Sequence, residues 1–363
     1  MSSIHQINGR QLTYIITGGQ VGTGLLALPS LLSQEAGQHA WMCILLGALV
    51  PFINLLVIDK LGSRHSGLNM VEMLRQILGK VGGTIAVVAF AGYLITSITV
   101  LVNAFARFIQ VYMLPRTPLW VIIFLGMICV VYAGLKGGRV VGRINETLFF
   151  GMVLSMFFIV IPAYYSHEFT NLLPLGELNA SEMLRGTLLT MYTFAGVEIL
   201  LVLYSQVDKA EEVKGAALRG LGLSTATYLI VTICCLLVFG PDRIVHYTWP
   251  GVSILKVAQV PVIERFEFYF LAIWVGIVLR RAIIPVFSSA LTLAQLFKME
   301  ERSAPIVLAV GIIVFSGGLL VPSIAVNYIL VRYFALAYLV MGFAFPLTLL
   351  LISWLRQGVN ANA

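Results

Sequence analysis

The stretch TGGQVGTGLLALP, residues Thr17–Pro29, interrupts an otherwise apolar helix near the start of the chain. Four glycines fall within residues 18–24, and each glycine costs a helix roughly 1 kcal/mol relative to alanine. Pro29 follows, and proline removes a backbone hydrogen bond from a helix interior. We therefore expect the helix to unwind around Gly18–Gly24 and then to resume.

Unwinding at the depth of a bilayer frees backbone N–H and C=O groups, which must face protein or a cavity instead of lipid. The N–H groups at the start of the resumed helix can hold a carboxylate, helped by the positive end of the helix dipole. A second interpretation remains open at this point. The glycines can also serve only to let neighbouring helices pack closely.

A second interruption, Tyr192-Thr-Phe-Ala-Gly-Val-Glu198, lies in the middle of another apolar stretch. It corresponds to the first interruption if the chain is one domain, residues 1–363, made of two five-span repeats of inverted topology at about 11–165 and 183–355. Broken helices at matching positions of two halves are typical of a binding site at the membrane midplane. The two halves show no clear residue-level similarity, so the predicted repeat rests on hydropathy and position.

Composition places the whole chain in a membrane. Of its 363 residues, 59% are hydrophobic and only 11% are charged, a balance that would cover a soluble protein with apolar surface. The formal charge of +7 is spread singly between apolar stretches, which argues against a nucleic-acid partner. A span needs roughly 20 apolar residues, and this length predicts ten spans, at 11–32, 39–58, 83–113, 118–134, 143–165, 183–205, 219–240, 265–297, 304–321 and 327–355.

The distribution of Lys and Arg predicts the orientation, because cytoplasmic segments hold the excess of these residues. With both termini inside, 14 of the 23 basic residues lie on the cytoplasmic side and six lie outside. The outer set is Arg116, Arg185, Arg243, Lys256, Arg265 and Arg332. We therefore expect both termini on the cytoplasmic side.

Glu198 is the one acidic residue deep within a predicted span. An ionisable group at that depth is costly and marks a functional site by default. Three roles remain open for Glu198: it is protonated, it relays protons, or it has the purely structural role of fixing the broken helix by accepting backbone N–H bonds. Arg280 and Arg281, in the eighth span, also need partners, which are Glu198, freed carbonyl groups or a polar partner subunit.

Other polar and amphipathic features are weaker signals. Tyr93, Thr96, Thr99 and Asn103 form a stripe that either faces a cavity or joins helices by hydrogen bonds. The connection after the second span holds an amphipathic stretch, residues 69–78, which predicts an interfacial helix. A second amphipathic stretch, residues 252–262, is expected to be re-entrant or lid-like.

Catalytic and metal-binding patterns are not found in the sequence. The five histidines lie in termini or loops without a second ligand at the usual spacing, and no glycine-rich phosphate loop with its lysine occurs. We therefore expect neither an enzyme, a cofactor nor a bound metal.

Two motifs resemble the amino acid–polyamine–organocation (APC) superfamily of transporters: Gln20-Val-Gly-Thr-Gly-Leu-Leu-Ala-Leu-Pro29 and Phe194-Ala-Gly-Val-Glu198. Further segments, in order along nearly the whole chain, narrow the resemblance to the endospore germination permease family, the B subunits of nutrient germinant receptors. These segments are Ala36–Trp41, Ile77–Gly82, Gly142–Glu146, Asn171–Pro174, Gly196–Leu200 and Ile263–Glu267 with Trp274.

The resemblance implies an all-α integral membrane protein with about ten helices in the LeuT-type arrangement, broken in helices 1 and 6. It also implies residence in the bacterial spore inner membrane, surrounded by lipid, with an A-type subunit and a lipoprotein C-type subunit as partners. The implied function is sensing of a small nutrient germinant, such as an amino acid or a sugar. The alternatives are a proton- or sodium-coupled amino-acid transporter and a structural scaffold for the other subunits.

The resemblance also assigns site residues. Those carried over from the superfamily's ligand-binding motifs are Val21, Gly22, Thr23, Gly24 and Leu25 in the first span and Tyr192, Phe194, Ala195 and Gly196 in the sixth. Glu198 and Arg280 are the expected ion, proton or structural charges.

Overall fold

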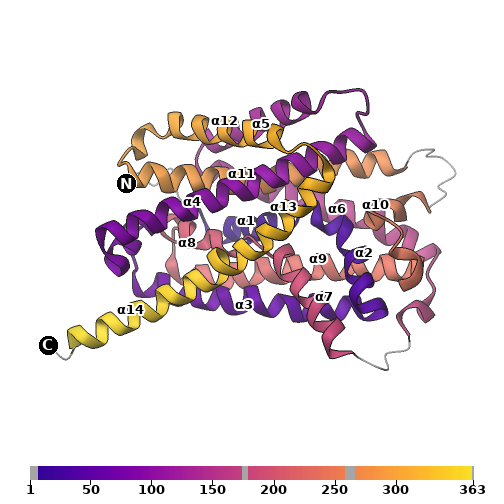
Figure 1. Ribbon diagram of the computed structural model, residues 1–363, viewed down its shortest axis with the longest axis horizontal. Helices are drawn as coiled ribbons and strands as arrows, with labels where there is room; N and C mark the ends of the chain where they lie inside the picture. The colour runs from indigo at the N-terminus through magenta and orange to yellow at the C-terminus, as the bar shows by residue number, and fades with distance from the viewer. Residues whose placement is uncertain (1–6, 174–178, 258–265, 362–363) are drawn as a thin grey trace.

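The computed structural model describes residues 7–173, 179–257 and 266–361, and in these ranges the regular structure is helical. Most of the long helices run along the long axis of the molecule, and α13 and α14 cross the others obliquely (Figure 1). The α-helices are α1 Gly9–Gln20, α2 Gly24–Ala36, α3 Ala40–Arg64, α4 Met70–Tyr112, α5 Leu119–Leu135, α6 Gly138–Tyr165, α7 Ala180–Thr193, α8 Leu200–Leu203, α9 Ala210–Ile244, α10 Pro250–Ser253, α11 Phe266–Leu296, α12 Ala304–Leu320, α13 Ile324–Ala337 and α14 Phe345–Ala361. Short 3-10 helices are η2 Gly37–His39, η3 Phe169–Leu172, η4 Val197–Ile199, η5 Tyr204–Gln206, η6 Ile254–Lys256 and η7 Glu300–Arg302, and a π-helix, η8 Tyr338–Ala344, joins α13 to α14.

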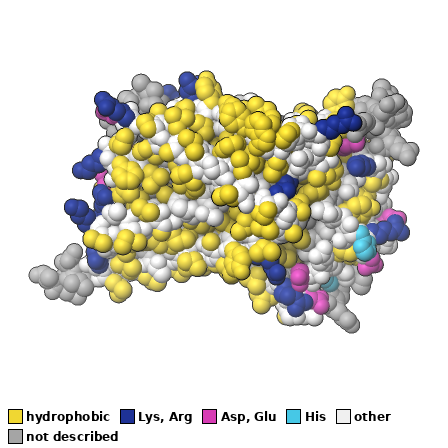
Figure 2. Space-filling view, turned by 45° about the horizontal axis from the view of Figure 1, so that its top comes forward, with side chains coloured by type: hydrophobic (Ala, Val, Ile, Leu, Met, Phe, Trp, Pro, Cys, Tyr) yellow, Lys and Arg dark blue, Asp and Glu magenta, His cyan; other side chains and the backbone are white. Residues whose placement is uncertain are grey.

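Each of the ten predicted spans coincides with a helix or with a broken helix. Six helical segments of the described chain are long and apolar enough to cross a membrane. The apolar helices α5 and α12 have 17 residues each, which is near the lower limit for a span. The first and sixth spans are the two broken ones, α1 with α2 and α7 with α8. Hydrophobic side chains cover the middle of the molecule, and charged side chains gather mainly at its two ends (Figure 2).

The amphipathic stretch at 69–78 forms a separate helical segment, as the sequence predicts. Its start is capped by Asn69, whose side chain accepts from the N–H of Glu72 while the Glu72 carboxylate accepts from the N–H of Asn69. Gly79, at φ 81°, ends this segment before the membrane-spanning part of α4 begins. The apolar side chains Met70, Val71, Met73, Leu74 and Ile77 are buried, so this face packs against the protein.

The second amphipathic stretch is only partly described. Its first residues belong to α10 and η6, and Val252, Ile254 and Leu255 are fully buried. Gly251 lies so close to Leu26 of α2 that a Cβ atom would come within 2.9 Å of that side chain. This part covers α2, the second half of the first broken helix. Residues 258–265, which include the end of this stretch and part of the Ile263–Glu267 motif, lie outside the described residues.

The start of α1 and the end of α14 lie at the same end of the bundle. The backbone N–H of Ile7 donates to the carbonyl of Gln206 at 2.8 Å, and η5 contacts the last turn of α3. Just beyond α3, a ring nitrogen of His65 lies 2.9 Å from the hydroxyl of Ser353 in α14. This arrangement agrees with an even number of spans.

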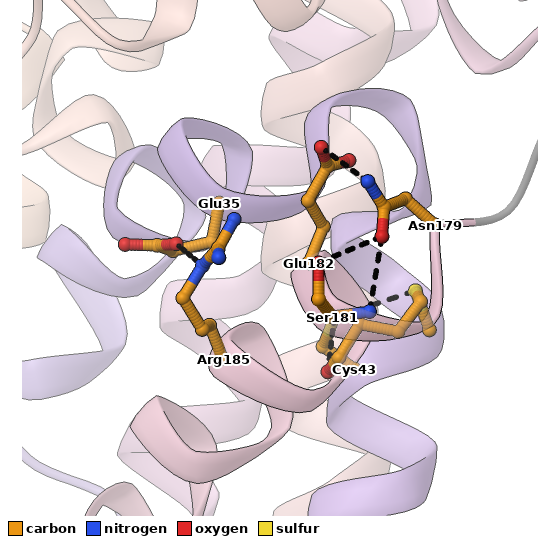
Figure 3. Close-up of polar contacts among 7 residues, drawn as sticks. Glu35, Cys43, Asn179, Ser181, Glu182 and Arg185 are labelled. Atoms are coloured by element: carbon orange, nitrogen blue, oxygen red, sulfur yellow. Dashed lines mark hydrogen bonds and ion pairs between the residues drawn. The ribbon is translucent and has the colours of Figure 1, made fainter.

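At the opposite end of the bundle, the second half of the first broken helix, α2, is joined to the first half of the other, α7. Glu35 of α2 and Arg185 of α7 form an ion pair at 2.8 Å (Figure 3). One helical turn further in, the hydroxyl of Thr190 donates to the carbonyl of Cys43 in α3 at 3.1 Å, and Gly47 leaves room for that hydroxyl. The halves α2 and α7 therefore pack together and against α3.

Candidate functional site

The first helix breaks where its glycines predict. α1 ends at Gln20 and α2 begins at Gly24, so residues 21–23 lie between the two helices. Within the described chain, the backbone N–H groups of Gly22, Thr23 and Gly24 have no hydrogen-bond partner. These N–H groups lie at the start of a helix of 13 residues, which is the usual place for anion binding.

The sixth span breaks between α7 and η4. Gly196 adopts φ 131°, a conformation that side chains rarely tolerate. A Cβ atom on Gly196 would lie 2.8 Å from the carbonyl oxygen of Gly19. The backbones of the two breaks therefore approach each other directly at Gly19 and Gly196.

Polar side chains tie the two breaks together. The buried Gln20 amide donates to the carbonyl of Phe194 at 3.1 Å. The hydroxyl of Tyr228, from α9, lies 2.9 Å from the carbonyl of Gln20 and 3.4 Å from that of Thr193. Carbonyl groups freed by unwinding are thus satisfied by side chains, as membrane-depth backbone requires.

Glu198 closes the second break. It is 3% exposed. One carboxylate oxygen accepts from the N–H of Gly196 at 2.7 Å, and the other accepts from the hydroxyl of Tyr93 at 2.7 Å. The carboxylate therefore bonds a backbone N–H at the break, the contact expected if Glu198 holds the broken helix.

The two arginines of α11 point to different surroundings. The guanidinium of Arg281 donates to the freed carbonyl of Gln20, one of the predicted kinds of partner. It also packs on the first break, where a Cβ atom on Gly22 would come within 2.5 Å of the Arg281 side chain. Arg280 is fully buried and turns toward α6, with contacts to the carbonyl of Asn145 at 3.4 Å and the sulfur of Met152 at 3.0 Å.

A cavity lies beside the two breaks. The cavity is small, about 40 Å³ in volume. Its walls come from both broken helices and from α4, α11 and α13. The lining residues are Gly19, Leu94, Ser97, Ile98, Leu101, Ala195, Gly196, Glu198, Ile199, Arg281, Pro285 and Phe334.

The predicted site residues fall into three groups. Ala195, Gly196 and Glu198 line the cavity. Val21, Gly22, Thr23, Gly24 and Leu25 form the first break, and Phe194 packs its ring against Tyr228 beside it, but the cavity wall does not include them. Tyr192 belongs to the last turn of α7. Arg280 faces away, toward α6.

Sequence reasoning did not assign Gln20, Arg281, Ser97 and Phe334 to the site. Gln20 and Arg281 carry a signal, since each is a polar residue within an apolar span. Of the polar stripe in α4, Tyr93 bonds Glu198 and Asn103 donates to the carbonyl of Gly318. Thr96 and Thr99 bond back to their own helix.

An all-helical membrane bundle whose two broken helices meet beside a central cavity is the architecture of a secondary transporter. Two solved transporter structures share it. The crystal structure of MhsT in complex with L-phenylalanine superposes with a TM-score of 0.68 at 14% identity, over 92% of this chain and 88% of that one. The structure of a Na⁺-coupled sialic acid symporter in a substrate-bound, outward-open state superposes with a TM-score of 0.64 at 10% identity, over 86% of this chain and 73% of that one. The predicted LeuT-type fold is confirmed.

Sequence comparison defines the family. A family model described as "Spore germination protein" matches residues 6–322, and the chain belongs to this family. Spore germination protein YndE of Bacillus subtilis (strain 168) is 26% identical over 305 residues, 83% of this chain and 84% of that protein. Spore germination protein GerQB of Bacillus cereus is 26% identical over 280 residues, 76% of each. These findings confirm the resemblance drawn from the motifs.

Proposed function

We propose that this chain is the nutrient-sensing membrane subunit of a spore germination receptor and that it binds a small germinant between its two broken helices. The observation that carries the proposal is the meeting of the breaks beside a cavity, with unpaired N–H groups at Gly22–Gly24. Membership of the spore germination protein family supports the biological setting.

The unpaired N–H groups favour a ligand that carries a carboxylate. Three donors without a partner in the described chain lie at the first break, at the positive end of the α2 dipole. An amino acid meets this requirement better than a neutral sugar does. The transporter MhsT, which shares the fold, was solved with L-phenylalanine, and this supports an amino-acid germinant here.

Arg281 bears on the alternative of a sodium-coupled transporter. In transporters with broken helices, carbonyl groups at the breaks coordinate the coupling cation. Here the carbonyl of Gln20 already accepts from the guanidinium of Arg281 and from the hydroxyl of Tyr228. A fixed positive charge at this carbonyl favours a site that works without sodium. Proton-coupled transport remains the competing function.

The proposal extends to assembly and location. We place the chain in the spore inner membrane with both termini on the cytoplasmic side, in complex with an A-type subunit and a lipoprotein C-type subunit. Support comes from the excess of Lys and Arg on that side and from the positions of Ile7 and Ser353 at one end of the bundle.

The experiment that tests the function compares sensing with transport. Spores lacking the chain are exposed to single amino acids and sugars, and the purified chain in liposomes is tested for uptake of the same labelled compounds. We expect loss of the germination response to at least one nutrient without measurable uptake. Concentrative uptake of that nutrient, with or without a proton gradient, would assign the chain to the transporters instead.

A further inference from the structure

Arg332 is a charged residue on the lipid-facing side of a membrane helix. The predicted orientation counts Arg332 among the basic residues outside the membrane, but the structure places it inside α13, eight residues after Ile324. Eight residues correspond to about 12 Å along a helix axis. Arg332 is exposed, and within the described chain no hydrogen bond or ion pair involves it.

The depth of Arg332 follows from its neighbour Phe334. The ring of Phe334 stacks on Tyr93 at 5.1 Å between centroids, and Tyr93 in turn bonds Glu198 at the second break. Arg332 precedes Phe334 by two residues, which is about 3 Å of rise and about 200° of rotation on a helix. The Arg332 side chain therefore leaves α13 near the level of the central cavity, on the face opposite Phe334.

The other arginines predicted inside spans each contact polar groups or sulfur of the chain itself. Arg107 donates to the carbonyl of Val321 at 2.7 Å and to the side chain of Asn103 at 3.0 Å. Arg281 donates to the freed carbonyl of Gln20, and Arg280 contacts the carbonyl of Asn145 within α6 and the sulfur of Met152. Charged residues within membrane helices almost always face the bundle interior or a charged partner. Arg332 has neither within the described chain.

The helix face around Arg332 carries large exposed hydrophobic side chains. Ile329, Tyr333, Leu336 and Val340 are exposed by 53%, 67%, 60% and 59%. Their separations of four, three and four residues follow the α-helical repeat of about 3.6 residues per turn, so these side chains share one face.

We propose that this face of α13 docks a transmembrane helix of a different protein chain and that an Asp or Glu in the middle of that helix pairs with Arg332. A second copy of this chain does not offer such a residue among its described positions. Apart from the buried Glu198, and Glu146, which pairs with Arg10, acidic residues there lie in connections or within two turns of a helix end. The occupant therefore has its own carboxylate at membrane depth.

The docked helix would share α13 with the cavity, since Phe334 is part of the cavity wall. A carboxylate that pairs with Arg332 would thus also influence the position of Phe334, which follows Arg332 by two residues in the same helix. The assignment of Arg332 does not depend on which small molecule the cavity holds.

The test uses the full chain in its native membrane. Arg332→Leu, Arg332→Lys and the control Arg302→Leu, in the exposed connection η7, are solubilised in mild detergent and sized by native electrophoresis. We expect Arg332→Leu to reduce the fraction of the chain in a hetero-complex at least tenfold, while Arg332→Lys and Arg302→Leu retain it. The melting temperature of the isolated Arg332→Leu chain should equal or exceed that of the wild type, because an unpaired charge has been removed.

A photo-crosslinking residue at Tyr333 then identifies the contact. The expected product joins this chain to a membrane-helix peptide with an Asp or Glu within one turn of the crosslink, and reversal of that acid to Arg together with Arg332→Glu should restore the complex. The proposal is overturned if Arg332→Leu leaves the complex intact. It is also overturned if the position crosslinks only to lipid and the variant loses bound anionic lipid, which would make Arg332 a headgroup ligand.

Discussion

Replacing Gly196 by alanine should disturb the contact between the two breaks more than any other single methyl group. The residue holds φ 131°, and a non-glycine residue in such a region costs about 1–3 kcal/mol. The new Cβ atom would also lie 2.8 Å from the carbonyl oxygen of Gly19 and 2.9 Å from its carbon. Relieving an overlap of this kind typically costs about 1–3 kcal/mol.

The same shift of the second break relieves both effects, so their sum is an upper bound, and we expect a loss of about 3 kcal/mol. Because 1.4 kcal/mol corresponds to a tenfold change in an equilibrium constant, a site that must re-form this contact to bind would weaken roughly 100-fold. Thermal unfolding of the purified chain measures the first effect, and the nutrient concentration for half-maximal germination measures the second.

The matched control is Gly92→Ala on the exposed face of α4, where a Cβ atom would meet nothing within 4 Å. Alanine there should be neutral or slightly stabilising, because it favours the helix. If Gly196→Ala unfolds and responds like Gly92→Ala, the close approach of the two breaks has no bearing on stability or on nutrient binding.

Three further substitutions separate the roles of the site. Glu198→Gln can still accept the backbone N–H of Gly196 and donate to Tyr93, so we expect normal stability but a reduced nutrient response. Glu198→Leu leaves both of these groups unpaired, at a cost in stability of about 1–3 kcal/mol each. A normal response in the glutamine variant would limit Glu198 to hydrogen bonding. At Gly24 a Cβ atom would meet only a methyl group at 3.9 Å, so Gly24→Ala should keep the half-maximal nutrient concentration within about threefold of the wild-type value. Gly24→Val should raise that concentration at least tenfold, because its larger side chain crowds the free N–H groups. Equal effects of alanine and valine would remove Gly24 from the site. Arg281→Met should weaken the nutrient response roughly 10- to 100-fold, since a hydrogen bond from a charged group to the Gln20 carbonyl contributes about 1.5–3 kcal/mol. The response of the wild-type chain should persist when sodium is replaced by N-methylglucamine. A sodium requirement would show that the arginine does not fill the cation site.

The spans and both breaks were predictable because their signals are local. An apolar run of sufficient length defines a span, and the glycines of residues 18–24 lower helix stability where they stand. The same holds for the segment 69–78, whose capping residues Asn69 and Glu72 are only three positions apart. Each of these features depends on neighbours in the sequence.

The connections between polar groups were not predictable, because they join distant parts of the chain. Tyr93 and Glu198 are 105 residues apart, and Arg281 and Gln20 are 261 apart. Spacing identifies each of them as polar and membrane-embedded, but only packing decides which meets which. The adjacent residues Arg280 and Arg281 illustrate this, since about 100° of helix rotation sends one toward α6 and the other to the first break.

The central claim is that a nutrient binds between the two broken helices, and equilibrium binding to the purified chain in lipid nanodiscs tests it most directly. The ligands are the labelled nutrients whose germination response requires the chain. We predict saturable binding of one molecule per chain that Gly24→Val and Gly196→Ala weaken at least tenfold and Gly92→Ala leaves unchanged. Binding that is equally strong in all three variants would place the nutrient elsewhere and contradict the account.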